Sequence, residues 1–118
     1  MSQILHVDNS DFFRKLMKAF LSGCGYQSEN FARGGDTLAA AESGSVICVI
    51  AGLALSDMSG EEFIKRLAVT VPAVPVIVVT SENDEAQHHR LMALGVKAII
   101  QKSADWKEQL GEQLAIIT

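Results

Sequence analysis

Short apolar runs alternate along the chain with longer stretches in which apolar residues recur every three or four positions. The runs, at 3–7, 26–31, 46–51, 74–80 and 96–101, predict strands, the second being the weakest. The longer stretches, at 11–22, 36–44, 59–71, 83–94 and from 103 onward, predict helices. The pattern therefore predicts strands and helices in strict alternation.

Residues that favour the ends of helices stand at the borders of these stretches. Ser10 and Ser103 are predicted N-caps, and Ser59 with Glu62 three residues later has the spacing of a capping box. Helix ends are predicted at Gly23 or Gly25, before Pro72, and at Gly95.

Each helical stretch has an apolar side predicted to face the core. The predicted buried positions are Phe12, Phe13, Leu16, Met17, Phe20 and Leu21, then Phe63, Ile64, Leu67 and Ala68, then Leu91 and Leu94, and last Trp106, Leu110 and Leu114. Met92 and Ala93 are left toward the surface. The strands read as continuous apolar runs, as expected for parallel strands covered on both faces.

Five consecutive βα units predict one α/β domain over residues 1–118. Right-handed crossovers give an open, doubly wound parallel sheet between two helical layers, and the flavodoxin-like strand order is 2-1-3-4-5. Sites in such folds lie where the strands end.

Composition narrows the function. The formal net charge of −4 argues against direct nucleic-acid binding, which needs a basic face. The two cysteines, Cys24 and Cys48, lack CxxC spacing and are expected to be reduced. Neither a signal peptide nor a membrane-spanning run is evident, so a cytoplasmic location without membrane contact is expected.

Polar residues stand at the ends of three of the strands, and a glycine stands at the end of a fourth. Asp8, Thr80 and Lys102 stand where the first, fourth and fifth strands end, and Gly52 stands where the third ends. These ends meet at one edge of the sheet, so a carboxylate, a hydroxyl and an ammonium should converge there.

These segments resemble the receiver domains of bacterial two-component response regulators. ILHVDNS resembles the segment in which an acidic pair follows the first strand, and VICVIAGLALSDMSGEEF resembles the segment with the phospho-accepting aspartate and a Met-x-Gly turn. PVIVVTS and GVKAIIQKS resemble the strands that end at the family's Thr/Ser and Lys. All four fall in the family's order and spacing over the whole chain.

The resemblance assigns roles and reveals departures. It implies that Thr80 and Lys102 match the residues that contact the phosphoryl group and that Asp8 is the first of the acidic pair. Asn9 replaces the second, a Mg²⁺ ligand, and Gly52 replaces the phospho-acceptor. In addition, Ser103 replaces a proline, and Ile99 stands at the aromatic switch position.

These departures remove the chemistry of an ordinary receiver. Glycine can neither accept a phosphoryl group nor ligate a metal. In an ordinary site three carboxylates repel one another, by roughly 4 kcal/mol for a pair about 4 Å apart, and Mg²⁺ offsets this repulsion. Here only Asp8 remains, so we expect Lys102 to balance it directly or through water, with no Mg²⁺ or other cofactor. Asn9 and Ile99, like Gly52, replace residues that the phosphorylation chemistry or its switch requires. This favours natural loss of phosphorylation over an engineered change or a glycine kept for structural reasons.

The sequence thus predicts a phosphorylation-independent receiver module, a pseudo-receiver without enzymatic activity. It would bind a protein partner or dimerise through the face formed by the last helix, strand and helix. An apolar patch there would comprise Met92, Ala93, Ile99 and Trp106.

Alternative interpretations are weaker. Asp57 could be a substitute acceptor in phosphoryl transfer, although a solvated loop residue is the simpler interpretation, as it is for Ser56. A flavodoxin-like nucleotide or flavin site would need a glycine-rich loop after the first strand, where DNSDFFRK stands.

The histidines suggest no site. His6 is interpreted as a buried, hydrogen-bonded core residue rather than a metal ligand or pH sensor. His88 and His89 point about 100° apart on a helix and are interpreted as surface residues.

Overall fold

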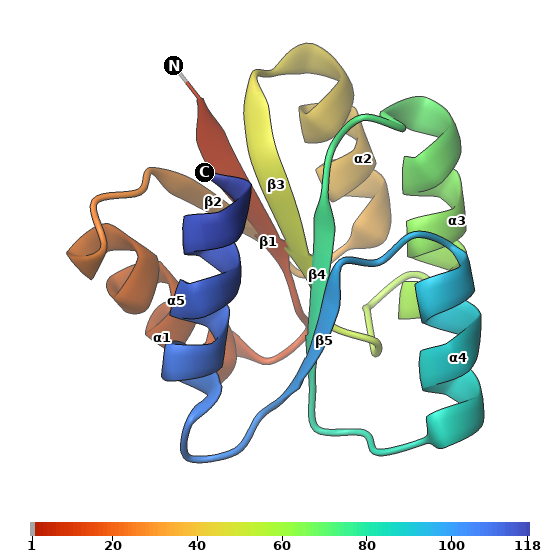
Figure 1. Cartoon of the computed structure of the whole chain (residues 1–118). Coiled ribbons are helices and arrows are strands. Elements are labelled where there is room, and N and C mark those ends of the chain that lie inside the picture. Colours follow the sequence, from red (N-terminus) through yellow and green to blue (C-terminus); the bar gives the residue numbers. More distant parts are fainter. Residues whose placement is uncertain (1) are drawn as a thin grey trace.

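The computed structural model describes residues 2–118 and shows strands and helices in strict alternation (Figure 1). The elements are β1 (Gln3–Val7), α1 (Asp11–Gly23), β2 (Ser28–Phe31), α2 (Gly34–Ser43), β3 (Val46–Ala51), α3 (Gly60–Thr70), β4 (Val76–Thr80), α4 (Glu85–Ala93), β5 (Ala98–Gln101) and α5 (Trp106–Ile117).

The strands form one parallel sheet of five strands in the order β2-β1-β3-β4-β5. Helices α1 and α5 cover one face of the sheet, and α2, α3 and α4 cover the other (Figure 1). The predicted flavodoxin-like α/β fold and its strand order are therefore confirmed.

Successive side chains along each strand point to opposite faces of the sheet, and this divides the core into two clusters. Leu5 and Val7 of β1 pack toward α2, α3 and α4, whereas Ile4 packs toward α1 and α5. The second cluster is rich in aromatic side chains, because Trp106 of α5 lies against Phe13 of α1, with ring centroids 5.0 Å apart.

The helix caps are mostly those that the sequence predicts. The hydroxyls of Ser10 and Ser59 accept the N–H groups of Phe13 and Glu62, each at 3.1 Å. Ser103 is not a helix cap, because α5 begins at Trp106 and the Ser103 hydroxyl instead donates to the Asp105 carboxylate at 2.7 Å. This hydrogen bond lowers the pKa of Asp105.

Several predicted positions differ in detail. Phe12 is 72% exposed, because the buried line on α1 runs through Phe13, Met17 and Leu21. Ala68 on α3 is also exposed.

The starts of some elements shift as well. Strands β2, β4 and β5 begin two residues later than predicted, so the apolar residues before β4 and β5 belong to loops, while α2 begins two residues earlier, at Gly34. These loop residues pack against the core, which is why their sequence pattern resembles a strand.

The loop between β3 and α3 turns back closely on itself. The Gly60 N–H donates to the Leu53 carbonyl at 2.9 Å. A Cβ on Gly60 would lie 2.5 Å from the Leu53 Cα and 2.6 Å from the Gly52 carbonyl oxygen. Only glycine fits this approach, which places the start of α3 beside the end of β3.

Candidate functional site: the carboxyl edge of the sheet

Four of the residues singled out from the sequence meet at one edge of the sheet. Asp8 follows β1, Gly52 follows β3, Thr80 ends β4 and Lys102 follows β5. All four line a cavity of about 100 Å³, and Asn9 and Glu82 are among the other lining residues. The parallel topology therefore brings together the residues that the sequence places at the strand ends.

Asp8 and Lys102 form the ion pair expected from the sequence. Asp8 is only 3% exposed, and its Oδ2 lies 2.9 Å from the Lys102 Nζ. The approach is angled outside hydrogen-bond geometry, so the contact is electrostatic rather than an aligned hydrogen bond. The other oxygen, Oδ1, accepts the Ser10 N–H at 2.9 Å.

Lys102 is held on a second side by an aromatic ring. Its Nζ lies 4.1 Å from the centroid of the Phe13 ring, within the range of a cation–π contact. The Lys102 backbone N–H donates to the Thr80 carbonyl at 2.8 Å, which fixes the lysine beside β4. The ammonium is thus held by Asp8 after β1 and by Phe13 of α1, while the Lys102 backbone is joined to β4.

Because Gly52 has no side chain, the Asp8 carboxylate can lie close to it. A Cβ on residue 52 would lie 2.9 Å from the Asp8 Oδ2 and 3.2 Å from its Cγ. The same glycine donates its N–H to the Val7 carbonyl at 2.8 Å, so β1 and β3 are tightly joined here. Gly52 and the conformation of Asp8 therefore fit each other.

Thr80 has a local structural role at this edge. Its hydroxyl oxygen accepts the Glu82 N–H at 2.9 Å, and this caps the loop after β4. The Thr80 side chain is buried, while Asn9 on the other side of the cavity is exposed.

The residues present do not fit a Mg²⁺ site. Magnesium requires several oxygen ligands in octahedral geometry, commonly including carboxylates. Among the described residues, Asp8 is the one carboxylate that directly follows a strand, and its two oxygens already face Ser10 and Lys102, while Glu82 in the cavity wall lies on the loop after β4. Within residues 2–118, moreover, His, Cys, Asp and Glu side chains form no cluster of three that could hold a metal ion.

Asp57 has a specific structural partner that the sequence analysis missed. Its two carboxylate oxygens accept the N–H groups of Gly34 and Gly35, at 2.7 and 3.0 Å. These are the first residues of α2, whose own N-cap residue, Arg33, makes no side-chain cap. The Gly35 N–H is the largest of the effects that lower the pKa of Asp57. Asp57 is exposed, as predicted, but it caps a helix from a distant loop.

A signal for this cap was present in the sequence. Helix α2 begins with Gly34 and Gly35 after Arg33, and none of these three residues is a Ser, Thr, Asp or Asn that could cap its first turn. A helix start without a local cap leaves unsatisfied N–H groups, which must find a partner elsewhere.

His6 is buried, but the predicted hydrogen bond is not formed. Burial lowers its pKa to about 4, against the opposing effect of the Asp8 charge, so the ring is neutral at pH 7. Neither ring nitrogen has a partner at hydrogen-bond geometry, although Asn30 on β2 lies close enough to raise the pKa slightly. The ring instead contacts Phe13 edge-on, with centroids 5.9 Å apart.

The other two histidines differ from each other. His89 is exposed as expected, whereas His88 is half-buried.

The predicted apolar patch is only partly on one surface. Trp106 is 7% exposed and packs against Phe13 and Phe20 under α1, so it is not part of that patch. Met92 is 51% exposed and Ala93 is also exposed, both near the end of α4. Ile99 of β5 is half-buried against the cluster that includes Leu91.

Comparison with known proteins identifies the family. Residues 4–114 match the model of the response regulator receiver domain. The chain therefore belongs to the receiver domain family, and it is a receiver domain of a two-component signalling system. No protein with curated function matches the chain at significant similarity.

Solved receiver structures share the fold over nearly their whole length. The chemotaxis protein CheY4 of Vibrio cholerae is 25% identical, with a TM-score of 0.88 over 100% of this chain and 99% of that chain. A CheY-like receiver domain protein from Methanospirillum hungatei JF-1 is 26% identical, with a TM-score of 0.88 over 99% of this chain and 96% of that chain. The non-phosphorylated HemR receiver domain from Leptospira biflexa is 19% identical, with a TM-score of 0.88 over 100% of this chain and 95% of that chain. At this identity the likeness supports the shared fold only.

Proposed function

We propose that this receiver domain signals without phosphorylation of residue 52 and without bound Mg²⁺. One observation carries the proposal: the Asp8 carboxylate oxygen lies only 2.9 Å from where a Cβ on residue 52 would be, and the carboxylate is paired with Lys102. Gly52 supplies no oxygen to accept a phosphoryl group. The cation that normally faces a phosphoryl group is already paired. The domain would act through protein contacts and not as an enzyme.

A phosphodonor experiment tests this proposal. The domain is incubated with acetyl phosphate and Mg²⁺ and analysed by intact-mass spectrometry. We expect no added phosphoryl group, and stable labelling would overturn the proposal. The positive control is the double variant Gly52→Asp with Asn9→Asp, in which Mg²⁺ binding and labelling should return if the rest of the scaffold is competent.

Asp57 is the specific alternative acceptor, and the structure gives a reason against it. Both of its oxygens accept N–H groups at the start of α2, so attack on a phosphodonor would require this cap to open. If labelling were observed, the Asp57→Asn variant would locate it. Labelling lost in that variant would establish the alternative.

The flavodoxin-like nucleotide or flavin site is a third possibility, tested by the same preparation. A purified protein without flavin absorbance or bound nucleotide would exclude it.

We further propose that the contact surface lies on the α4–β5 side of the domain. Receiver domains interact with partner proteins, and here Met92 and Ala93 of α4 are exposed and Ile99 of β5 is half-buried. No helix in the described residues is both long and apolar enough to cross a membrane. We propose a protein as the partner, including a second copy of the chain.

Light scattering over a range of concentrations tests self-association through this surface. Met92→Glu should abolish any dimer, because a charge at the centre of an apolar contact must be desolvated. Val69→Glu is the matched control, since Val69 on α3 is also exposed and lies outside this surface. A monomer at all concentrations would exclude the dimer and leave a different partner.

A further inference from the structure

Strand β2 forms an open edge of the sheet. Among the described strands it pairs only with β1, and β5 forms the opposite edge (Figure 1). The carbonyls of Gln27 and Phe31 accept N–H groups from β1 and the residue after it, at 2.9 and 3.0 Å. Because backbone groups alternate in direction along a strand, the N–H and carbonyl groups of Ser28 and Asn30 point away from β1. They face the open edge, where a further strand could pair with them.

A groove follows this edge beside α1. It consists of two adjoining hollows of about 610 and 390 Å³, which share Lys18 and Ser22 in their walls. The first hollow is lined by residues of α1 and by Asn30, and the second continues along the chain of β2 to Ser28 and Gln27. The groove is therefore much larger than the cavity of about 100 Å³ at the carboxyl edge, and it runs beside a strand that has no second neighbour.

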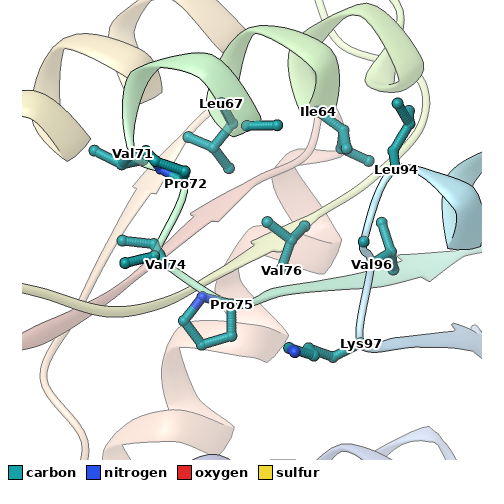
Figure 2. Close-up of a pocket in the computed structure, with 13 residues that line it drawn as sticks. Ile64, Leu67, Val71, Pro72, Val74, Pro75, Val76, Leu94, Val96 and Lys97 are labelled. Carbon is teal, nitrogen blue, oxygen red and sulfur yellow. The ribbon is translucent and has the colours of Figure 1, made fainter.

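Another cavity, of about 290 Å³, lies between the last turns of α3 and the loops before β4 and β5 (Figure 2). The side chains of Leu67, Val76 and Val96 line it but are at most 8% exposed, because they pack into the core. The groove along β2 differs from this cavity, because the side chains of Lys15 and Lys18 in its wall are exposed.

The groove is positively charged in a chain that is negative as a whole. Its lining includes one carboxylate and three cationic side chains, those of Asp11, Arg14, Lys15 and Lys18, whereas the formal net charge of the chain is −4. Asp11 is paired with Arg14, and within residues 2–118 the two lysines take part in no ion pair. Glu29 of β2 does not neutralise them, because alternation along the strand turns it to the other face of the sheet. The charge of the groove therefore favours an anionic partner.

Lys18 covers part of the open edge in the free domain. Its Nζ contacts the Ser28 carbonyl, one of the groups that face the edge. A lysine at a strand edge disfavours pairing with a neutral strand, because its charge would lose water without gaining a partner. An acidic strand avoids this penalty, since a peptide N–H can replace the ammonium at the carbonyl while a carboxylate pairs with Lys18.

We propose that the edge of β2 binds an extended acidic segment of a partner protein. The segment would add a strand through the outward N–H and carbonyl groups of Ser28 and Asn30, with its carboxylates in the groove beside Lys15 and Lys18. A helical segment could not do so, because its own backbone groups are already paired. This surface and the contact surface proposed at α4–β5 lie at opposite edges of the sheet, so neither proposal depends on the other.

Amide chemical-shift titration of the ¹⁵N-labelled protein tests the proposal. The probe is a blocked peptide of about seven alternating Glu and Thr residues, which is the length of an ordinary strand. We expect saturable shifts in α1 and β2, with a Kd of the order of 1 mM at low salt. The affinity should fall about fivefold at about 0.3 M NaCl, because exposed charges are screened.

Hydrogen exchange locates the binding on the strand edge. The amides of Ser28 and Asn30 should exchange more slowly with the peptide bound, whereas those of Glu29 and Phe31, which face β1, should be unaffected. A peptoid with the same side chains has no backbone N–H groups and should bind about tenfold more weakly than the peptide.

Two double variants connect the binding to the charge of the groove. Lys15→Gln with Lys18→Gln should weaken the peptide about five- to tenfold, the combined effect of two exposed charge pairs. Lys97→Gln with Lys107→Gln is the matched control, since it removes the same charge at exposed positions outside the groove. The control should bind as the parent does.

Circular dichroism confirms that each variant is folded. The proposal is overturned if the peptide gives no saturable shifts, or if it binds without slowing exchange of the Ser28 and Asn30 amides. It is also overturned if the peptoid binds equally well, or if the control variant loses as much affinity as the groove variant.

Discussion

Two aspartates near the same edge of the sheet have opposite environments. Asp8 is buried at the end of β1 and faces the ammonium of Lys102, whereas Asp57 is exposed and accepts two backbone N–H groups of α2. A buried carboxylate needs a full opposite charge, because water cannot stabilise it. An exposed carboxylate can be held by the partial positive charge of a helix start. The two regions should therefore respond very differently to loss of a partner.

The largest effect is expected from Lys102→Met. This change leaves the buried Asp8 carboxylate unpaired and should lower the free energy of unfolding at pH 7 by about 3 kcal/mol. Urea denaturation measures the change, and Lys107→Met, at an exposed position, is the control. The double variant Asp8→Asn with Lys102→Met should be more stable than Lys102→Met alone. Equal stability would mean that the two side chains are not coupled.

A pH dependence is expected from His6 in the same buried region. Its pKa is lowered by burial to about 4 in the folded protein, from the ordinary value of 6.5 for an exposed ring. The unfolded chain therefore takes up the proton first as the pH falls. The stability contribution is fully present above pH 6.5 and falls by up to about 3 kcal/mol as the pH reaches 4.

Denaturation of the parent and of His6→Leu across this pH range measures the contribution. The difference between the two profiles should appear between pH 6.5 and 4. Parallel profiles would show that His6 does not titrate differently in the folded state.

A smaller effect is expected from Gly52→Ala. The added Cβ would lie 2.9 Å from the Asp8 Oδ2, so the carboxylate must move away from Lys102. We expect a loss of about 1–2 kcal/mol, measured by urea denaturation. The loss should shrink in the Lys102→Met background, because no ion pair remains to be disturbed. A full loss in that background would instead point to strain at the joined ends of β1 and β3.

The smallest effect is expected at the exposed carboxylate. Asp57→Ala removes the cap of α2 and should cost about 1 kcal/mol, while Asp57→Asn keeps an acceptor oxygen and should cost less. Hydrogen exchange should show faster exchange of the Gly34 and Gly35 amides. Glu42→Ala, near the other end of α2, is the control. Unchanged exchange in Asp57→Ala would contradict the cap.

The sequence predicted elements best where the apolar pattern is unbroken. The bounds of β1 and β3 are those expected, and so is the strand order. Predictions failed where an apolar residue fits the spacing of a strand or of a buried helix face but lies in a loop or on the surface. Val74 and Val96 read as strand residues but lie in the loops before β4 and β5, where they pack against the core. Phe12 read as core but lies beside the buried line of α1.

For the site, the sequence identified Asp8, Gly52, Thr80 and Lys102, which converge at the carboxyl edge, but not Glu82 in the cavity wall or the Phe13 ring beside Lys102. It also predicted the Asp8–Lys102 pair, because a lone carboxylate beside a lysine has one obvious partner. It did not identify the Asp57 cap on α2. It placed Trp106 on the buried side of the last helix, where the ring lies, and the additional suggestion that Trp106 belongs to a surface patch does not fit its burial.

The sequence by itself determined the order of the elements and the set of residues at the strand ends, because apolar periodicity and strand direction are local properties. Only the tertiary structure decided that Asp8 occupies the space beside Gly52, that Asp57 caps α2, and that Trp106 lies under α1. Each of these depends on distances between segments far apart in the chain, and such distances are set by packing.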